Sequence, residues 1–258
     1  MYKPAQIDSS DRAFNYGDGF FTTMLVKQGR IEHLELHQQR LLDCQTQLGF
    51  PPLSPKLWNE ILFEAQNLVH SVLKVVISRG SGGRGYSPTH CAGAHWVISS
   101  HGVPAHQPLW RDKGVVADFA TVALASGGSC SNLKTLNRIE QVQLKQQAEA
   151  KRVDELICQD VFGNVVEGVS ANIFWMKNQK VYTPGLKWAG IHGVKRAWLL
   201  KVLAQAGVET IVGEFSQDEV QDADELWFTN SVFGIVPVAQ LGSHFYSQFR
   251  FCRWLQTQ

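Results

Sequence analysis

A lysine in an apolar setting is the first residue of the chain that could do chemistry. Lys134 stands in the segment 131–138 (SNLKTLNR), flanked by Leu133 and Leu136. Desolvation favours the neutral form of a lysine amine, and a neutral amine can attack a carbonyl carbon. Lys134 is therefore a candidate Schiff-base nucleophile. A solvated lysine in the first turn of a helix is the alternative, and position alone favours it.

A carboxylate interrupts a second apolar run. Glu167 lies in 165–174 (VVEGVSANIF), which reads as a strand. If it is buried, this carboxylate needs a partner, and a protonated ring nitrogen would serve. An outward-facing residue on a half-exposed strand is the alternative.

Several segments could bind a phosphate group. Residues 193–196 (GVKR) open a predicted helix, whose first amides are free to bind an anion, and residues 229–231 (TNS) could add donors after a strand. Arg40 lies one helical turn after His37, beside an apolar stripe, where a guanidinium could bind a buried phosphate. For Arg40 alone, a surface charge is the alternative.

Two other patterns predict less than they first suggest. His33 and His37 are four residues apart, but they do not form the HExxH motif and no third ligand is evident, so we expect no metal. The glycines of 80–85 (GSGGRG) match a dinucleotide fingerprint, yet Pro88 follows where a helix should open. Arg79 and Arg84 in this loop could bind carboxylates, and a solvated surface loop is the alternative.

Composition limits the function classes. Hydrophobic residues make up 44% of the 258 residues and charged residues 18%, with a net charge of +1. This balance argues against general binding to nucleic acid or to a membrane surface. No stretch approaches the roughly 20 apolar residues of a membrane span, and the N-terminus is too polar for a signal peptide. The five cysteines are odd in number and lack CxxC spacing, which indicates reduced thiols in a cytoplasmic protein.

Apolar periodicity and turn residues predict the elements that position these residues. Predicted strands cover 20–27, 72–78, 94–100, 115–124, 155–159, 165–176, 181–183, 226–228 and 235–238. Predicted helices run from 34 to 48, from 55 to about 70, from 136 to 152 and from 194 to 207, with a short helix after Ser216. We expect a mixed α+β protein with an N-terminal domain over 1–104, a linker over 105–112 and a C-terminal domain over 113–258 that carries Lys134.

Six segments, in order along nearly the whole chain, resemble one family. The chain is similar to the fold-type IV pyridoxal-phosphate enzymes, which include branched-chain and D-amino acid transaminases and aminodeoxychorismate lyases. The segments are 11–21 (DRAFNYGDGFF), 33–41 (HLELHQQRL), 134–137 (KTLN), 167–174 (EGVSANIF), 190–194 (GIHGV) and 237–238 (PV). The resemblance implies the D-amino acid aminotransferase-like fold, with pyridoxal 5′-phosphate in the interdomain cleft. It also implies a homodimer whose active sites share loops.

The same resemblance implies roles for individual residues. Lys134 would form the Schiff base and act as acid and base, and Glu167 would pair with the pyridine nitrogen. The phosphate would be bound by Arg40, the amides of Val194 and Lys195, and Ser231. The family usually has threonine at the positions of Lys195 and Ser231, so only the serine keeps the hydroxyl.

Within the family, three segments are closest to the lyase branch: 19–23 (GFFTT), 75–86 (VVISRGSGGRGY) and 134–142 (KTLNRIEQV). Transaminases typically carry glutamate at the position of Thr22. The resemblance implies conversion of 4-amino-4-deoxychorismate to 4-aminobenzoate and pyruvate, a step of folate synthesis, with Arg84, Arg79 and Thr22 near the substrate. A transaminase of the same fold and a noncatalytic ligand-binding homologue are the alternatives.

Overall fold

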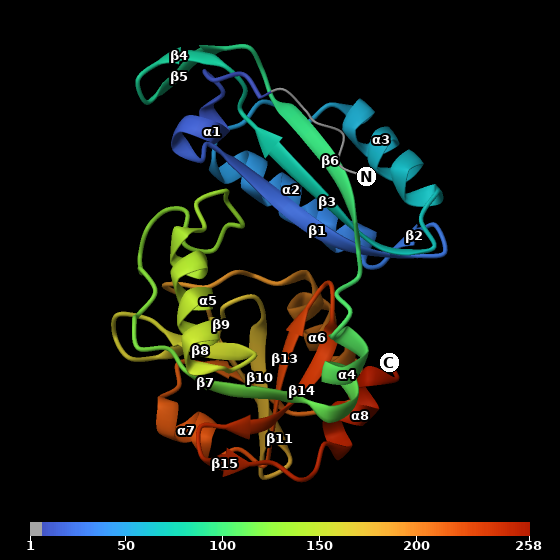
Figure 1. Cartoon of the computed structure of the whole chain (residues 1–258), viewed down its shortest axis with the longest axis vertical. Coiled ribbons are helices and arrows are strands. Elements are labelled where there is room, and N and C mark those ends of the chain that lie inside the picture. Colours follow the sequence, from blue (N-terminus) through green and yellow to red (C-terminus); the bar gives the residue numbers. More distant parts are fainter. Residues whose placement is uncertain (1–6) are drawn as a thin grey trace. The chain divides into compact units, whose positions relative to one another are not determined.

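The computed structural model describes residues 7–258 and divides the chain into two compact units. The first consists of the described residues up to Val103 together with Leu133–Arg138, and the second of Pro104–Asn132 and Ile139–Gln258 (Figure 1). Residues 1–6, which belong to the predicted N-terminal domain and to its polar start, lie outside the described residues. In the described part of the chain, no helix has the length and apolar character needed to cross a membrane.

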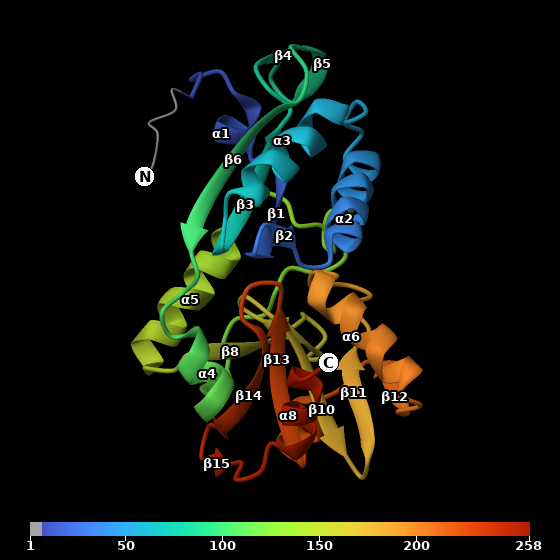
Figure 2. The same ribbon diagram turned by 90° about the vertical axis from the view of Figure 1, so that its right-hand side faces the viewer.

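The first unit is built on a four-stranded antiparallel sheet in the order β2-β1-β3-β6. The strands of this sheet are β1 (Gly19–Lys27), β2 (Arg30–Ile31), β3 (His70–Ser78) and β6 (His95–Gly102), and a separate hairpin holds β4 (Gly82–Arg84) and β5 (Ser87–Cys91). The helices of the unit are α1 (Arg12–Tyr16), α2 (Leu34–Gln47) and α3 (Pro55–Gln66). Helices α2 and α3 cover one face of this sheet (Figure 2). Alternate side chains of β1 face them, and Phe20, Met24 and Val26 are fully buried there.

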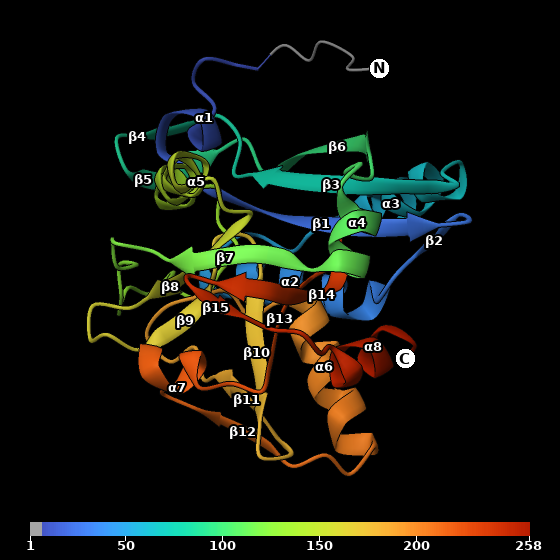
Figure 3. The ribbon, with the colours of Figure 1, turned by 60° about the horizontal axis from the view of Figure 1, so that its bottom comes forward.

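The second unit is built on a nine-stranded mixed sheet. Eight strands follow the order β12-β11-β10-β13-β14-β7-β8-β9, and β15 pairs with β14 (Figure 3). The strands are β7 (Val115–Phe119), β8 (Glu155–Gln159), β9 (Val165–Gly168), β10 (Asn172–Lys177), β11 (Lys180–Pro184), β12 (Thr210–Gly213), β13 (Glu225–Asn230), β14 (Gly234–Leu241) and β15 (His244–Phe245). The helices are α4 (Gln107–Lys113), α5 (Ile139–Lys151), α6 (Val194–Gln205), α7 (Gln217–Gln221) and α8 (Arg250–Gln256).

The segment expected to be a linker, 105–112, and the glycine-rich segment expected to be a loop both contain regular structure. Residues 105–112 include most of α4, with Pro108 in the first turn, where proline is tolerated because that amide has no helical partner. The glycine-rich segment after β3 forms the hairpin β4–β5. A dinucleotide fingerprint would require a helix to begin there, and none does. The Arg12 guanidinium supports the tip of this hairpin by donating to the carbonyls of Gly85, Tyr86 and Ser87.

The segment around Lys134 belongs to the first unit, whereas the sequence-based boundaries placed it in the C-terminal domain. Leu133 lies in the hydrophobic core formed by β1, β3, α2 and α3. The residues after it pair with the edge of β1, so α5 begins at Ile139 and not at Leu136. The predicted position of the cofactor between the domains stays a prediction.

Candidate active site

Lys134 is attached to the edge of strand β1. Its carbonyl accepts a hydrogen bond from the amide of Phe21 (3.0 Å), and the amide of Leu136 donates to the carbonyl of Gly19 (3.0 Å). The half-buried Lys134 side chain places its ammonium 4.5 Å from the centroid of the Phe21 ring. Because Lys134 precedes α5 and is paired with a strand, it is not the solvated first-turn lysine that was the alternative.

Thr22, the next residue of β1, contacts helix α2. Its hydroxyl lies 2.7 Å from Nδ1 of His37, and Arg40 Nη1 donates to the same hydroxyl over a long 3.5 Å. Thr22 and His37 are fully buried, and Arg40 is half-buried. The first unit therefore brings Arg40 and Thr22 together, as neighbours in one hydrogen-bonded group.

The two arginines of the glycine-rich segment have different surroundings. Arg79 is buried, where its guanidinium pairs with Asp18 (2.8 Å) and donates to the carbonyls of Leu48 and Gly49. It also lies 3.9 Å from the centroid of the Phe50 ring. Arg84, in β4, is exposed. Arg79 is thus part of the framework of the first unit, and Arg84 is the accessible cation.

The second unit holds Glu167 in a buried, oriented position. Its side chain lies at the end of β9 and is 5% exposed, which excludes the outward-facing alternative. One carboxylate oxygen, Oε2, accepts a hydrogen bond from the amide of Ile191 (2.8 Å) and a longer one from Nδ2 of Asn172 (3.3 Å). The same Nδ2 donates to the Ile191 carbonyl (2.8 Å). Asn172 therefore links the carboxylate to the turn that precedes α6.

Helix α6 begins with the features of an anion site. Its N-cap is Gly193, which makes no side-chain cap hydrogen bond, and the first amides of a helix, here those of Val194 and Lys195, have no acceptor within the helix itself. A Cβ at Gly193 would overlap Oδ1 of Asn172, so glycine is required for this packing. The Lys195 ammonium lies 3.5 Å from the centroid of the Trp198 ring. Lys195 thus contributes its amide at the start of the helix while its side chain packs on an aromatic ring.

Ser231 lies in the turn between β13 and β14. The side chain of Asn230 fixes this turn, because Oδ1 accepts hydrogen bonds from the amides of Val232 and Phe233 (2.9 and 2.8 Å), and Nδ2 donates to the carbonyl of Ser170. The half-buried Ser231 is therefore presented by an ordered turn, in the same unit as Glu167 and the start of α6.

Sequence reasoning missed two polar residues, Asn172, which donates to Glu167, and Glu155, which binds the residues that follow β9. From the sequence, Asn172 was included only as part of the segment 167–174, and no role was assigned to it or to Glu155. The Glu155 carboxylate is 4% exposed and accepts hydrogen bonds from the amides of Val169 and Ser170 and from the Ser170 hydroxyl. Burial raises the pKa of Glu155, and the hydrogen bond from Ser170 opposes that rise. The signal that singled out Glu167, a carboxylate within an apolar strand, also applies to Glu155.

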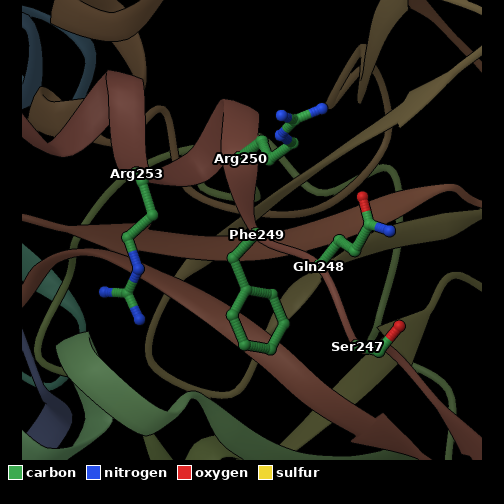
Figure 4. A pocket seen from close by; sticks show the side chains of 5 residues that line it. All are labelled: Ser247, Gln248, Phe249, Arg250 and Arg253. Carbon is green, nitrogen blue, oxygen red and sulfur yellow. The ribbon is translucent and has the colours of Figure 1, made fainter.

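A surface pocket of the second unit is lined by none of the candidate site residues described above. It is lined by residues before and within α8, shown in Figure 4: Ser247, Gln248, Phe249, Arg250 and Arg253. Arg253 donates to the carbonyl of Arg111 and to the side chain of Gln256, so one of its two arginines serves packing within the unit.

Comparisons with known proteins place the chain in a family. Residues 19–241 match the family described as amino-transferase class IV. The chain belongs to this family. The expected resemblance and the expected mixed α+β fold are thereby confirmed, and class IV aminotransferases of this kind depend on pyridoxal 5′-phosphate.

Individual relatives include both branches of the class IV family. The chain is 36% identical to aminodeoxychorismate lyase of Vibrio harveyi over 239 residues, which cover 90% of this chain and 86% of that protein. The crystal structure of 4-amino-4-deoxychorismate lyase from Pseudomonas aeruginosa matches with a TM-score of 0.93 and 33% identity, covering 99% of this chain and 95% of the other. A putative branched-chain-amino-acid aminotransferase of Methanocaldococcus jannaschii is 29% identical over 93% of this chain and 84% of its own length.

Proposed function

We propose that the protein is an aminodeoxychorismate lyase, which converts 4-amino-4-deoxychorismate to 4-aminobenzoate and pyruvate in folate synthesis. The observation that carries this proposal is its 36% identity to the Vibrio harveyi lyase over nine-tenths of the chain. The lyase structure from Pseudomonas aeruginosa supports it with a TM-score of 0.93 over 99% of the chain. Thr22, where transaminases typically carry glutamate, is a further lyase-like feature.

The donor set of the chain fits pyridoxal phosphate. We assign covalent attachment of the cofactor to the amine of Lys134, which is half-buried beside an aromatic ring. Glu167 is assigned to the ring nitrogen, because a buried carboxylate with a fixed orientation keeps such a nitrogen protonated. When bound, the cofactor supplies an electron sink for the carbon that loses a proton.

The phosphate group is assigned to donors of three kinds. These are the Arg40 guanidinium, the first amides of α6 at Val194 and Lys195, and the Ser231 hydroxyl. A helix start with a glycine N-cap and no side-chain cap offers its amides and the positive end of its dipole to an anion. The α6 helix has twelve residues, so its dipole is well developed.

Proton transfer is assigned to Lys134. With its amine free, Lys134 would take the proton from the substrate carbon that bears the nitrogen. The electron pair of that C–H bond forms the new ring double bond as the bond to the enolpyruvyl oxygen breaks, and the enolpyruvate that is released takes up a proton and becomes pyruvate. Loss of this group makes the remaining ring aromatic, and the Lys134 amine would hold the cofactor again once 4-aminobenzoate has left.

Recognition of the substrate carboxylates is assigned to Arg84. Both Arg79 and Arg84 were candidates, but Arg79 is buried against Asp18 and two backbone carbonyls. Arg84 is exposed on a hairpin whose tip the Arg12 guanidinium holds by three carbonyls, so it can meet a carboxylate at little cost in backbone order. Thr22 is fully buried and bonded to His37, so we assign it to supporting Arg40.

The visible spectrum tests the proposal. The purified protein, supplied with pyridoxal phosphate, is expected to show the absorbance of a protein-bound imine, which borohydride reduction makes permanent. Lys134→Ala should lose this reducible species, whereas Lys56→Ala, a change of an exposed lysine, should keep it. A reducible imine in Lys134→Ala would contradict the assignment, and a protein that stays colourless with the cofactor would indicate the noncatalytic alternative.

A transaminase is the second candidate, because the Methanocaldococcus jannaschii relative is 29% identical over 93% of this chain. Pyruvate release from aminodeoxychorismate should exceed amino-group transfer to 2-oxoglutarate by a large factor if the protein is a lyase. The reverse ratio would identify a transaminase.

We also propose a homodimer located in the cytoplasm. Tyr16 and Tyr86 form an exposed aromatic pair in the first unit, with ring centroids 5.5 Å apart, and Phe14 is a further exposed aromatic residue of α1. Such surfaces are often covered by a partner. The five cysteines, all among the described residues, form no disulfide, as expected for a reducing compartment. Sedimentation equilibrium at micromolar concentration should give twice the chain mass of 28.9 kDa.

A further inference from the structure

A buried histidine beside the proposed phosphate-binding arginine has no role in the function proposed above. His37 lies in α2 and is 0% exposed, as is Thr22 in β1. The His37 Nδ1 atom and the Thr22 hydroxyl are 2.7 Å apart, a distance typical of a strong hydrogen bond. A buried pair of this kind is costly to break, because each group would leave the other without its partner.

The direction of this hydrogen bond follows from the neighbours of Thr22. Arg40 Nη1 lies 3.5 Å from the Thr22 hydroxyl, and a guanidinium can only donate. The Thr22 proton must therefore point elsewhere, and His37 Nδ1 is its available acceptor in the described structure. If Nδ1 accepts, the ring carries its proton on Nε2, which is buried without a partner among the described residues.

The surroundings of His37 also exclude a second proton on the ring. Burial lowers the pKa of His37 well below its usual 6.5, and the positive charges of Arg40, His33 and Lys134 lower it further. A charged imidazolium would face the positive charge of the Arg40 guanidinium. The neutral ring is therefore the stable form at neutral pH.

We infer that His37 is a positioning residue: its neutral ring accepts the Thr22 hydroxyl proton, which fixes that hydroxyl as an acceptor for Arg40 and sets the guanidinium for its anion. Arginine has a long, flexible side chain, and an anchored acceptor reduces the entropy lost when it binds a phosphate. A neutral ring does this without adding charge near Arg40 and Lys134. The assignment of the anion as the cofactor phosphate rests on the proposed function, whereas the tautomer and the hydrogen bond do not.

Cofactor affinity of the apoprotein tests the role. Thr22→Val and His37→Leu remove one hydrogen-bonding group each, and we expect pyridoxal phosphate to bind about tenfold or more weakly, the equivalent of one buried hydrogen bond. Thr22→Ser keeps the hydroxyl and His37→Asn keeps an acceptor near the place of Nδ1, so both should stay within about threefold of wild type. Thr183→Val, which removes an equally buried hydroxyl bonded to the Ile173 carbonyl, is the matched control.

A second measurement is made on the wild-type protein and needs no cofactor. Nitrogen-15 chemical shifts of the histidine rings in the wild-type apoprotein report the tautomer directly, with His37→Asn identifying the resonance. We expect a neutral ring with the proton on Nε2 at pH 7. A proton on Nδ1, a charged ring, or unchanged cofactor affinity in both Thr22→Val and His37→Leu would overturn the inference. If the wild type binds no pyridoxal phosphate at all, the proposed function fails, and the nitrogen shifts still decide the hydrogen bond.

Discussion

Asn172 occupies the space that a side chain on Gly193 would need. A Cβ at Gly193 would overlap Oδ1 of Asn172, and Nδ2 of the same amide donates to the Glu167 carboxylate and to the Ile191 carbonyl. One side chain thus sets both the buried carboxylate and the start of α6. Oriented groups of this kind depend on the residues that hold them, because small shifts at a binding site are costly.

Gly193→Ala should therefore disturb both features at once. The φ of Gly193 is −66°, an ordinary value, so the effect comes from steric overlap and not from backbone strain. We expect a loss of about 1–3 kcal/mol in the free energy of unfolding, the usual cost of overpacking, together with weaker cofactor binding. Gly128→Ala is the control, because a Cβ there meets nothing within 4 Å. Equal stability of the two variants would show that Asn172 can move aside.

Glu167→Gln should separate binding of the cofactor from its activation. Glutamine keeps the volume and can accept the hydrogen bond from the Ile191 amide, but it lacks the charge that stabilises a protonated ring nitrogen. We expect kcat for pyruvate release to fall about 100-fold or more while the imine absorbance is retained. The exposed Glu149→Gln should leave kcat unchanged. A kcat near that of wild type in Glu167→Gln would remove Glu167 from its assigned role.

Arg79→Gln should lower the stability of the protein, whereas Arg84→Gln should weaken substrate binding. Arg79 is buried and pairs with the half-buried Asp18, which keeps Arg12 as a second partner, so loss of the Arg79 hydrogen bonds should cost about 1–3 kcal/mol of stability. Arg84 is exposed, so its loss should leave stability within about 0.5 kcal/mol and raise KM about tenfold. Urea unfolding and steady-state kinetics measure the two effects. An unchanged KM in Arg84→Gln would require another cation for the substrate carboxylates.

The contrast between these arginines shows what local sequence can predict. The strand β1, the helix α2 and the short helix after Ser216 were expected, because their signals lie within a few neighbouring residues. Arg79 and Arg84 have the same type and the same glycine-rich surroundings. Only Arg79 is buried, because it bonds Asp18 and the Leu48 carbonyl at the end of α2, and both of these are distant from it in the chain. Pairing of Lys134 with β1 was not predicted for the same reason.

The pKa of Asp18 gives a prediction on acid stability. Burial acts to raise the pKa of this carboxyl, but hydrogen bonds from Arg79 and Arg12 outweigh it and hold the pKa below 3.8. A lowered pKa in the folded protein adds stability above the unfolded value, and this stability is lost as the pH falls through the folded value. Asp18→Asn should destabilise the protein by the same amount at pH 7 and pH 5, and the difference from wild type should shrink below about pH 4. A constant difference down to pH 3 would contradict the ion pair.

His37 predicts a second pH dependence at milder pH. Its pKa is lowered by burial and by Arg40, His33 and Lys134, so the unfolded chain binds a proton below about pH 6.5 that the folded protein does not. Stability should therefore fall as the pH drops from 6.5 to 5.5, by up to about 1.4 kcal/mol per pH unit for this one group. His37→Asn should show a correspondingly smaller slope in urea unfolding measured between pH 5.5 and 7.5. Identical slopes would indicate that the ring takes up a proton in the folded state.

The grouping of Leu133–Arg138 with the first unit has a consequence for biosynthesis. Leu133 fills a place in the core of β1, β3, α2 and α3, and the residues after it cover an edge of β1. A ribosome that has released residues up to Val103 has therefore not yet supplied a complete first unit. The nascent chain must wait with an open strand edge until this segment emerges, and during that interval a chaperone or a second nascent chain can bind the edge.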